Sequence, residues 1–480
     1  MKKSLLFLVS MSMVLLIASC SKTQRLEEDF PATIDSYLVS VVPVETAING
    51  LNSFLEEMGV ETRGESAKTI ASIETHYSES LRNENGEPVP DVYLVNYDNN
   101  EGYALLGANS SVTPIIAVIE HGNTSIKEIF SPTKVAPSSF EIGSLDPGIS
   151  PSRLVSMCVN GALYGEKQEI IETKSLPSVF NITQLTSNYL FNQHVTYCHK
   201  NNGGFVTNGC ASTALGIIVA YNNYPTMVVD GQFLGYSNLN SYTGTGTRFD
   251  FSDATLYFQL SDYFTNYSSI PSNLTSSQKL ALLCQIDNNI VNVHGTPSVL
   301  GESSFLRTRY KLTSAIFYIL NNIIQSWDAT GTMPNAVENG LEDLGYTNVD
   351  KTQKSSLKPS QIETIYNMLN DGKPVVMCGW SLFSLSDSHY WVVDGLKRNS
   401  TGYYIHCNWG WGGYQNGWFA SDCIRSTCGQ PYDNGSYGGS TGGDEWGNII
   451  VYSYDKQTTT PIVYENELNN RRIQYVPGSI

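Results

Sequence analysis

The chain has 480 residues, 41% of them hydrophobic, so it is long enough to bury a full core in more than one domain. It carries 28 basic and 45 acidic side chains, which gives a net charge of −17. Because an acidic surface repels phosphate backbones, we expect no nucleic-acid partner.

The first twenty residues have the pattern of a signal peptide. Lys2 and Lys3 are followed by an apolar run over residues 5–17, which is too short for a comfortable membrane span. The run ends in Ile17-Ala18-Ser19-Cys20, which resembles a bacterial lipobox. The sequence therefore predicts lipidation of Cys20 and a lipid-anchored protein of the cell envelope, at the outer membrane or cell surface. The alternative is plain secretion, and no later segment is apolar enough to span a membrane.

The next segment predicts a helix followed by an antiparallel meander. Strands rich in Val, Ile, Leu and Tyr are separated by Asp, Asn and Gly, which is typical of tight turns. A further helix leads into a polar stretch that contains Pro177 and reads as a linker. We expect a domain boundary near residue 180. The predicted elements are a helix at 46–58, strands at 91–97, 103–107 and 114–120, a helix at 152–169 and a linker at 166–187.

The remainder changes from helical to strand-like patterns along the chain. Helices are predicted first, and strands with Gly-rich turns occupy residues 374–454. Helices followed by strands indicate an α+β domain. A flexible Gly/Ser loop is predicted at 433–447. The predicted helices are 209–221, 276–292, 314–327 and 359–370.

Cys210 stands at the start of the most apolar of these helices. A helix N-terminus stabilises a thiolate, the nucleophilic form of cysteine, through its dipole and its unpaired N–H groups. The N–H of Cys210 could also donate to an oxyanion. A lone cysteine here is more often structural, so a catalytic interpretation needs a partner.

The best partners lie in residues 386–419. If a hairpin turn is centred between Arg398 and Asn399, His389 faces Asn408 at the open end of the hairpin, about 5 Å away. His389 would then act as the base for Cys210, the Asn408 amide oxygen would orient the imidazole, and Trp409 would shield that bond. His406 lies on the same face as Asn408 and is the competing base. Asp394 is interpreted as part of an Asp-Gly turn, and Cys407 as inward packing.

Acyl transfer also needs a second oxyanion donor. Gln193, seventeen residues before Cys210, has a suitable amide, although Asn188 and Asn192 have the same capability. The sequence contains no CxxC and no HExxH pattern, so we expect no metal and no organic cofactor. A local bridge between Cys423 and Cys428 is left open.

Four stretches resemble the streptopain family of papain-like bacterial cysteine peptidases. "NGCASTALGIIVAYNNYP" is similar to the nucleophile segment, "SHYWVVDGL" to the histidine strand, "HCNWGWGGYQNGWF" to the Asn-Trp-Gly-Trp block and "FNQHVTYC" to the segment with the oxyanion Gln. The meander resembles the family's propeptide. Departures are Leu190-Phe191 before Gln193, where a Trp is common, and Asp387-Ser388 before His389, where small residues are common.

The resemblance implies a two-lobed papain-like catalytic domain at 181–480, preceded by an α+β propeptide domain with an antiparallel meander at 21–180, after a signal peptide at 1–20. It also implies a mobile Gly-rich loop near the cleft, matched by residues 435–447. Its catalytic residues would be Cys210 as nucleophile, His389 as base, Asn408 and Trp409 as the orienting pair, and Gln193 as oxyanion donor.

The expected function is a secreted or lipid-anchored cysteine endopeptidase, made as a zymogen, that forms a Cys acyl-enzyme. Its partners would be protein or peptide substrates and its own propeptide as an intramolecular inhibitor. The alternatives are a cell-wall amidase with a Cys-His-polar site and a non-enzymatic surface lipoprotein that binds proteins or glycans. An inhibitor built on the propeptide-like domain is disfavoured by the intact Cys, His and Asn.

Overall fold

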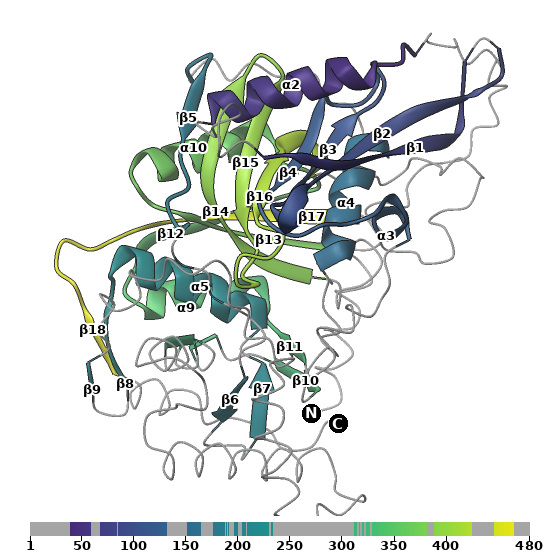
Figure 1. Cartoon of the computed structure of the whole chain (residues 1–480). Coiled ribbons are helices and arrows are strands. Elements are labelled where there is room, and N and C mark those ends of the chain that lie inside the picture. Colours follow the sequence, from purple (N-terminus) through teal and green to yellow (C-terminus); the bar gives the residue numbers. More distant parts are fainter. Residues whose placement is uncertain are drawn as a thin grey trace, which may run out of the picture. The chain divides into compact units, whose positions relative to one another are not determined.

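A single antiparallel sheet connects the two halves of the chain in this computed structural model (Figure 1). Its strands follow the order β1-β2-β3-β4-β16-β15-β14-β13-β17-β12, and β5 pairs with β14 beside that path. Residues from Ser40 onward belong to one compact unit. The structure describes residues 39–58, 68–83, 85–131, 151–164, 176–187, 189, 191, 196–199, 204–207, 209–229, 232–233, 312–313, 316, 319–320, 323–326, 329–381, 388–424 and 446–464.

The N-terminal part of the sheet confirms the predicted meander. Strands β2 (Pro88–Tyr97), β3 (Tyr103–Gly107) and β4 (Ile115–Ile119) pair antiparallel in chain order. The turn between β2 and β3 contains positive φ angles, including 102° at Gly102, whose Cβ would meet the carbonyl oxygen of Ile119. Strand β1 (Ile70–Arg82), which the sequence did not predict, pairs with β2 at the edge of the sheet.

The C-terminal part of the sheet follows the predicted strand-rich region. Its members are β5 (Phe180–Ile182), β12 (Thr347–Lys354), β13 (Val375–Ser381), β14 (Ser388–Asn399), β15 (Gly402–Asn408), β16 (Gly417–Ala420) and β17 (Trp446–Asp455). Strand β16 pairs with β4, through Trp418 opposite Val118. The predicted propeptide and the predicted peptidase therefore share one sheet, and the boundary near residue 180 stays a prediction.

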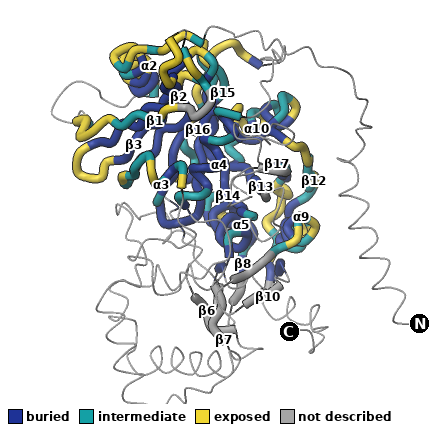
Figure 2. The backbone as a smooth tube through the Cα atoms, turned by 90° about the vertical axis from the view of Figure 1, so that its right-hand side faces the viewer, coloured by how far each residue is buried: buried dark blue, intermediate teal, exposed yellow. Residues whose placement is uncertain are grey.

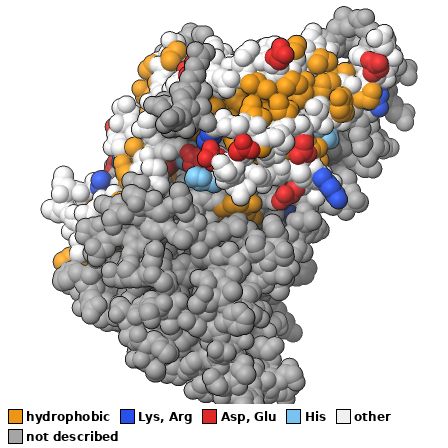
Figure 3. Space-filling model, in the orientation of Figure 1, with side chains coloured by type: hydrophobic (Ala, Val, Ile, Leu, Met, Phe, Trp, Pro, Cys, Tyr) orange, Lys and Arg blue, Asp and Glu red, His pale blue; other side chains and the backbone are white. Residues whose placement is uncertain are grey.

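Helices cover both faces of the N-terminal part of the sheet (Figure 1). Helix α2 (Val44–Glu57) places Phe54 in a small core with Tyr404 and Trp418. Helices α3 (Ile126–Phe130) and α4 (Pro151–Tyr164) pack on the opposite face, in the main core. Figure 2 shows the buried strands beneath these helices, and Figure 3 shows hydrophobic side chains gathered over the region of α2 and the β1–β2 pair.

Helix α5 (Gly209–Asn222) is buried along almost its whole length and contacts β13 and β14. It ends at Asn222, within one residue of the predicted end, and α10 (Pro359–Asn370) has its predicted bounds. Helix α9 (Pro334–Asp343) was not predicted. The predicted helix at 314–327 is wrong at its end, because Ile323–Ser326 forms β10, which pairs with β11 (Ala329–Gly331). The predicted helix at 276–292 lies outside the described residues.

Five short strands complete the part of the chain that is described. Strand β6 (Thr196–His199) pairs with β7 (Gly204–Thr207) just before α5. Strand β8 (Thr226–Val229) pairs with β9 (Gln232–Phe233) and, in parallel, with β18 (Ile462–Tyr464). The mixed composition confirms the predicted α+β class. No helix among the described residues is long and apolar enough to cross a bilayer.

The predicted linker is partly structured. Strand β5 pairs Ile182 with Leu396, and Arg398 Nη1 donates to the carbonyl oxygen of Pro177. Residues 176–187 therefore lie on the predicted peptidase domain and are held there by hydrogen bonds. Because residues 165–175 lie outside the described part, the earlier half of the predicted linker is not tested.

Candidate active site

The first turn of α5 presents Cys210. Gly209 precedes it with φ of 75°, a conformation that favours glycine, and the Thr213 hydroxyl donates to the Gly209 carbonyl oxygen at 3.0 Å. Cys210 is partly exposed, whereas the other free cysteines of the described residues are buried: Cys158, Cys378, Cys407 and Cys423. A partly exposed thiol at a helix N-terminus has the environment of a reactive cysteine. Cys428 lies outside the described residues, and Cys423 carries a free thiol here.

His389 lies near the start of β14 and is 2% exposed. Its Nε2 is 2.9 Å from the carbonyl oxygen of Trp409, and its ring stacks on Trp411 with centroids 4.6 Å apart. A carbonyl oxygen can only accept, so Nε2 carries the hydrogen. In the neutral ring Nδ1 is then the basic nitrogen. The stacking and the hydrogen bond together hold the imidazole in one orientation.

The predicted pairing of His389 with Asn408 is wrong. Asn408 faces Val392, and His389 pairs with Gly379 of β13. The hairpin turn lies two residues further along the chain than predicted, between Asn399 and Gly402, and β14 contains a bulge. A bulge adds a residue to one strand and shifts the register of everything beyond it.

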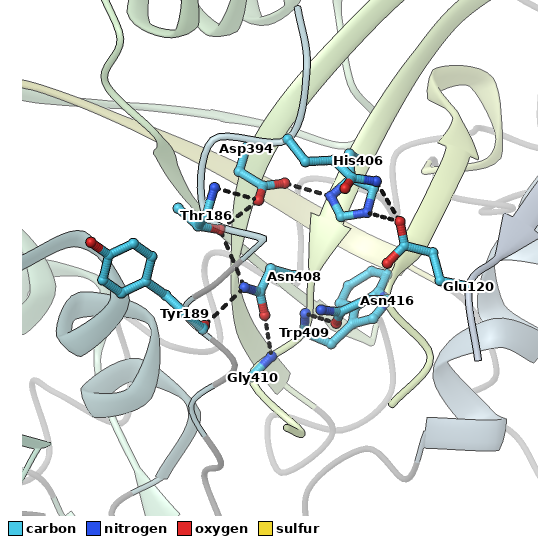
Figure 4. Close-up of polar contacts among 10 residues, drawn as sticks. Glu120, Thr186, Tyr189, Asp394, His406, Asn408, Trp409, Gly410 and Asn416 are labelled. Carbon is cyan, nitrogen blue, oxygen red and sulfur yellow. Dashed lines mark hydrogen bonds and ion pairs between the residues drawn. The ribbon is translucent and has the colours of Figure 1, made fainter. Parts of the chain in front are cut away.

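Asn408 therefore does not orient His389 with its own side chain. Its Oδ1 accepts from the N–H of Gly410 at 3.3 Å, while its Nδ2 donates to the Thr186 hydroxyl and the Tyr189 carbonyl, each at 3.2 Å (Figure 4). The N–H of Gly410 and the carbonyl of Trp409 belong to one planar peptide unit and point in opposite directions. Asn408 thus holds one side of the peptide whose other side accepts from His389.

Trp409 contributes through its backbone as well as its ring. The ring is fully buried against Trp391 and Phe419, with centroid distances of 5.0 and 5.2 Å. Its N–H donates to Asn416 Oδ1 at 2.9 Å. Trp409 was predicted to shield a bond between His389 and Asn408, but the acceptor that meets His389 is the backbone oxygen of Trp409 itself.

The turn at Trp409–Gly410 lies against the first turns of α5. Gly410 has φ of 77°, and a Cβ built on it would lie 2.8 Å from Thr213 Cγ2. Cys378, which neighbours the His389 partner Gly379 on β13, has a pKa raised by burial and further by the charge of Cys210. Helix α5, which begins at Cys210, packs against β13 and against β14, the strand that carries His389. The predicted roles of Cys210 as nucleophile and His389 as base stay predictions.

His406 is placed in a different environment from His389. Its Nδ1 is 2.5 Å from Asp394 Oδ1, and its Nε2 is 3.2 Å from Glu120 Oε1 (Figure 4). Burial opposes its protonation, but the charges and hydrogen bonds of Asp394 and Glu120 raise its pKa to about 10. A histidine that stays protonated at neutral pH is a poor base, so this environment disfavours His406 as the competing base.

Glu120, at the end of β4, supplies the second carboxylate of this group. Burial would raise its pKa, but the charge and hydrogen bond of His406, with a hydrogen bond from Gln184, lower it to about 2. Asp394 is the bulged residue of β14 and is fully buried, so its interpretation as a turn residue is wrong. The Asp-Gly pair marks a bulge here because Gly395 leaves room for the His406 Cβ and the Trp418 ring.

Sequence reasoning missed Thr186, Trp411 and Asn416. Trp411 and Asn416 were inside the quoted Trp-Gly block, but neither spacing nor residue type indicated their contacts. Thr186 stood in the predicted linker, where nothing signalled burial. Gln193, Cys20 and the Gly-rich loop at 435–447 lie outside the described residues, so their predicted roles are not tested.

Comparison with known proteins shows which proteins this part of the chain is similar to. A model described as the Peptidase C10 family matches residues 187–419, a span that contains Gln193, Cys210, His389, Asn408 and Trp409. Streptopain of Streptococcus pyogenes serotype M28 is 22% identical over 251 residues, 52% of this chain and 53% of that protein. Streptopain of serotype M3 matches to the same extent. The chain thus spans about half the length of the curated relatives it matches.

Two solved structures from Prevotella intermedia are also similar. A fragment of prointerpain A aligns with a TM-score of 0.42 at 12% identity, over 79% of this chain and 98% of that one. Active interpain A cysteine protease aligns with a TM-score of 0.32 at 15% identity, over 56% of this chain and 94% of that one. Helix α5, which begins at Cys210, and strand β14, which carries His389, both lie inside the matched span, so this part of the chain is similar to the streptopain-like C10 cysteine peptidases.

Proposed function

We propose that the chain is the precursor of a cysteine endopeptidase. The observation that carries this proposal is the packing of Gly410 on Thr213, because it brings the acceptor of His389 against the helix that begins at Cys210. A Cys210 thiolate would attack the substrate carbonyl, and the backbone N–H of Cys210 would donate to the oxyanion, together with the Gln193 amide. His389 would protonate the leaving amine and then activate the water that releases the acyl group.

We further infer that the N-terminal residues hold the precursor inactive. In support, Tyr103 of β3 donates to Gln415 Oε1 at 2.5 Å, and the N–H of Glu120 donates to the Asn416 carbonyl oxygen at 2.9 Å. Both acceptors lie in the loop that follows Trp409, and Asn416 also holds the Trp409 N–H. Removal of residues 21 to about 180 would release these contacts from the catalytic loop.

Cys20 is proposed as the site of a lipid anchor that keeps the protein at the cell envelope. The lipobox-like Ile-Ala-Ser-Cys end of the signal segment supports this. Replacing Cys20 with Ser should move the protein from the membrane fraction to the soluble fraction of the producing cell and abolish incorporation of labelled fatty acid. Equal membrane association of the variant would contradict the anchor.

The deciding experiment compares the chain that follows Cys20 with its Cys210→Ala variant under reducing conditions. The normal chain should shorten by about 160 residues over hours, digest an unfolded protein and react with a thiol-directed peptide inhibitor at Cys210. The variant should stay intact and inactive. Cys423→Ala, which removes a buried thiol outside the site, is the control and should retain activity. The proposal fails if cleavage of the linker by an added protease releases no activity and the inhibitor does not label Cys210.

A further inference from the structure

Asp394 is a buried carboxylate that the proposed reaction does not use. It is the unpaired residue of the β14 bulge, since Val393 faces Cys407 and Gly395 faces His406. A bulge re-aims the side chain of its extra residue. Here it points the carboxylate along the sheet, where both oxygens have partners: Oδ1 meets His406 Nδ1 at 2.5 Å, and Oδ2 meets the N–H and the hydroxyl of Thr186 at 3.0 and 2.5 Å.

Thr186 is the junction between this carboxylate and Asn408. Its side chain is fully buried, and its hydroxyl has only one hydrogen. Because that hydrogen goes to Asp394 Oδ2, the hydroxyl oxygen can only accept from Asn408 Nδ2, which lies 3.2 Å away. The charge of Asp394 therefore sets the direction of the hydrogen bond between Thr186 and Asn408.

The direction of that bond decides which way the Asn408 amide faces. With Nδ2 toward Thr186 and the Tyr189 carbonyl, Oδ1 must face the N–H of Gly410 (Figure 4). A flipped amide would set its oxygen against the Tyr189 carbonyl oxygen and its NH₂ group against the Gly410 N–H. Neither contact is a hydrogen bond, and buried unpaired groups are costly.

The Gly410 N–H belongs to the peptide whose carbonyl accepts from His389 Nε2 at 2.9 Å. Planarity ties the two ends of this peptide together, and a hydrogen bond to the N–H also polarises the carbonyl. We propose that Asp394 and Thr186 are positioning residues that act through Asn408 on the Trp409–Gly410 peptide and so fix the orientation of His389. This inference rests on the proposed function, because it assigns His389 as the base.

The matched pair Thr186→Val and Thr186→Ser tests it. Valine has the shape of threonine without the hydroxyl, so it breaks the junction while filling the same space. Serine keeps the hydroxyl and loses only a methyl group. The loss of one buried hydrogen bond that matters in the transition state should lower kcat by about tenfold in Thr186→Val, with KM nearly unchanged. Thr186→Ser should stay within about twofold of the normal enzyme.

Two further measurements separate positioning from simple destabilisation. The pH profile of kcat/KM should shift in Thr186→Val and not in Thr186→Ser, because the carbonyl that stabilises the protonated imidazole is displaced. Ile365→Val, which removes a methyl group from a buried side chain of α10 outside this network, should lower the melting temperature without changing kcat or the pH profile. Equal kcat losses in the valine and serine variants, or in Ile365→Val, would overturn the proposal.

A spectroscopic readout keeps the inference testable if the chain proves not to be a peptidase. In the chain that follows Cys20, labelled with ¹⁵N-histidine, the Nε2 proton of His389 should give a protected signal, assigned by its loss in His389→Gln. Thr186→Val should speed exchange of this proton at least tenfold, while Thr186→Ser and Ile365→Val leave it unchanged. If the normal chain is inactive but the three variants show these exchange rates, the proposed function is overturned and the positioning role of Thr186 stands. Unchanged exchange in Thr186→Val would overturn the positioning role.

Discussion

Gly410 and Thr213 are in direct contact, and the space between them admits no Cβ on Gly410. This contact joins the turn that carries the acceptor of His389 to the helix that begins at Cys210. In the proposed site, the distance between Cys210 and His389 therefore depends on the absence of a side chain at Gly410.

Gly410→Ala should lower kcat at least tenfold because it pushes the Trp409–Gly410 turn away from α5. The new Cβ would lie 2.8 Å from Thr213 Cγ2. The backbone φ of 77° at this position costs a non-glycine residue a further ~1–2 kcal/mol. Gly372→Ala is the matched control, since Gly372 has φ of 69° and nothing within 4 Å of its Cβ position. Steady-state kinetics of the two variants separates the steric effect from backbone strain, and equal kcat in both would disprove the role of the contact.

Tyr103→Phe should speed conversion of the precursor to its shorter form. The change removes only the hydroxyl that donates to Gln415 at 2.5 Å and leaves that buried amide oxygen without its donor, a loss of about 1–3 kcal/mol. Tyr97→Phe is the control, because the buried Tyr97 hydroxyl has no hydrogen-bond partner among the described residues. Gel analysis over time measures the rates. Conversion of Tyr103→Phe at the normal rate would show that this contact does not restrain the loop.

The stability of the precursor should depend on pH through Glu120 and His406. The pKa of Glu120 is lowered from 4.5 to about 2, so its contribution is complete above pH 4.5 and is lost as the pH falls toward 2. The pKa of His406 is raised from 6.5 to about 10, so its contribution is complete below pH 6.5 and is lost as the pH rises toward 10. The two together favour the folded precursor most between pH 4.5 and 6.5.

Glu120→Gln tests this dependence in thermal unfolding of the Cys210→Ala precursor, which should not process itself. The variant should lose part of the decline in melting temperature below pH 4.5, because it has no carboxylate to protonate at this position. Its decline above pH 6.5 should be smaller and end at a lower pH, since the pKa of His406 in the folded state is raised less without the charge of Glu120. Identical melting curves for both proteins from pH 3 to 9 would mean that the ion pair does not contribute.

Phe54→Ala should destabilise the precursor by about 3–5 kcal/mol, because it empties a site at the centre of the small core under α2. The Phe54 ring meets Tyr404 edge-on at 4.8 Å and lies 4.6 Å from Lys397 Nζ, so its loss also weakens the contact of α2 with β14 and β15. Asn52→Ala, on the exposed side of the same helix, should change stability by less than about 0.5 kcal/mol. Urea unfolding of the precursor measures both, and equal midpoints would refute the role of this core.

Elements whose residue patterns are local could be predicted from the sequence. The meander, α5 and α10 follow from turn residues, from an unbroken apolar run and from a Pro-to-Gly helix span, and each was predicted close to its observed bounds. Cys210 and His389 could also be chosen from the sequence as the candidate nucleophile and base, because each was predicted at the start of a helix or strand and carries a side chain suited to that role. Those roles stay predictions. The family resemblance rested on the same short motifs.

How these residues meet depends on contacts between elements that are distant in the sequence. The bulge at Asp394 moved the hairpin register, and a bulge depends on what the extra residue contacts across the sheet, here His406 and Thr186. The burial of Thr186, the backbone acceptor for His389 and the pairing of β4 with β16 all join segments far apart in the chain. Such contacts are set by the packing of whole elements, and no local pattern of residue types records which backbone oxygen a buried histidine will meet.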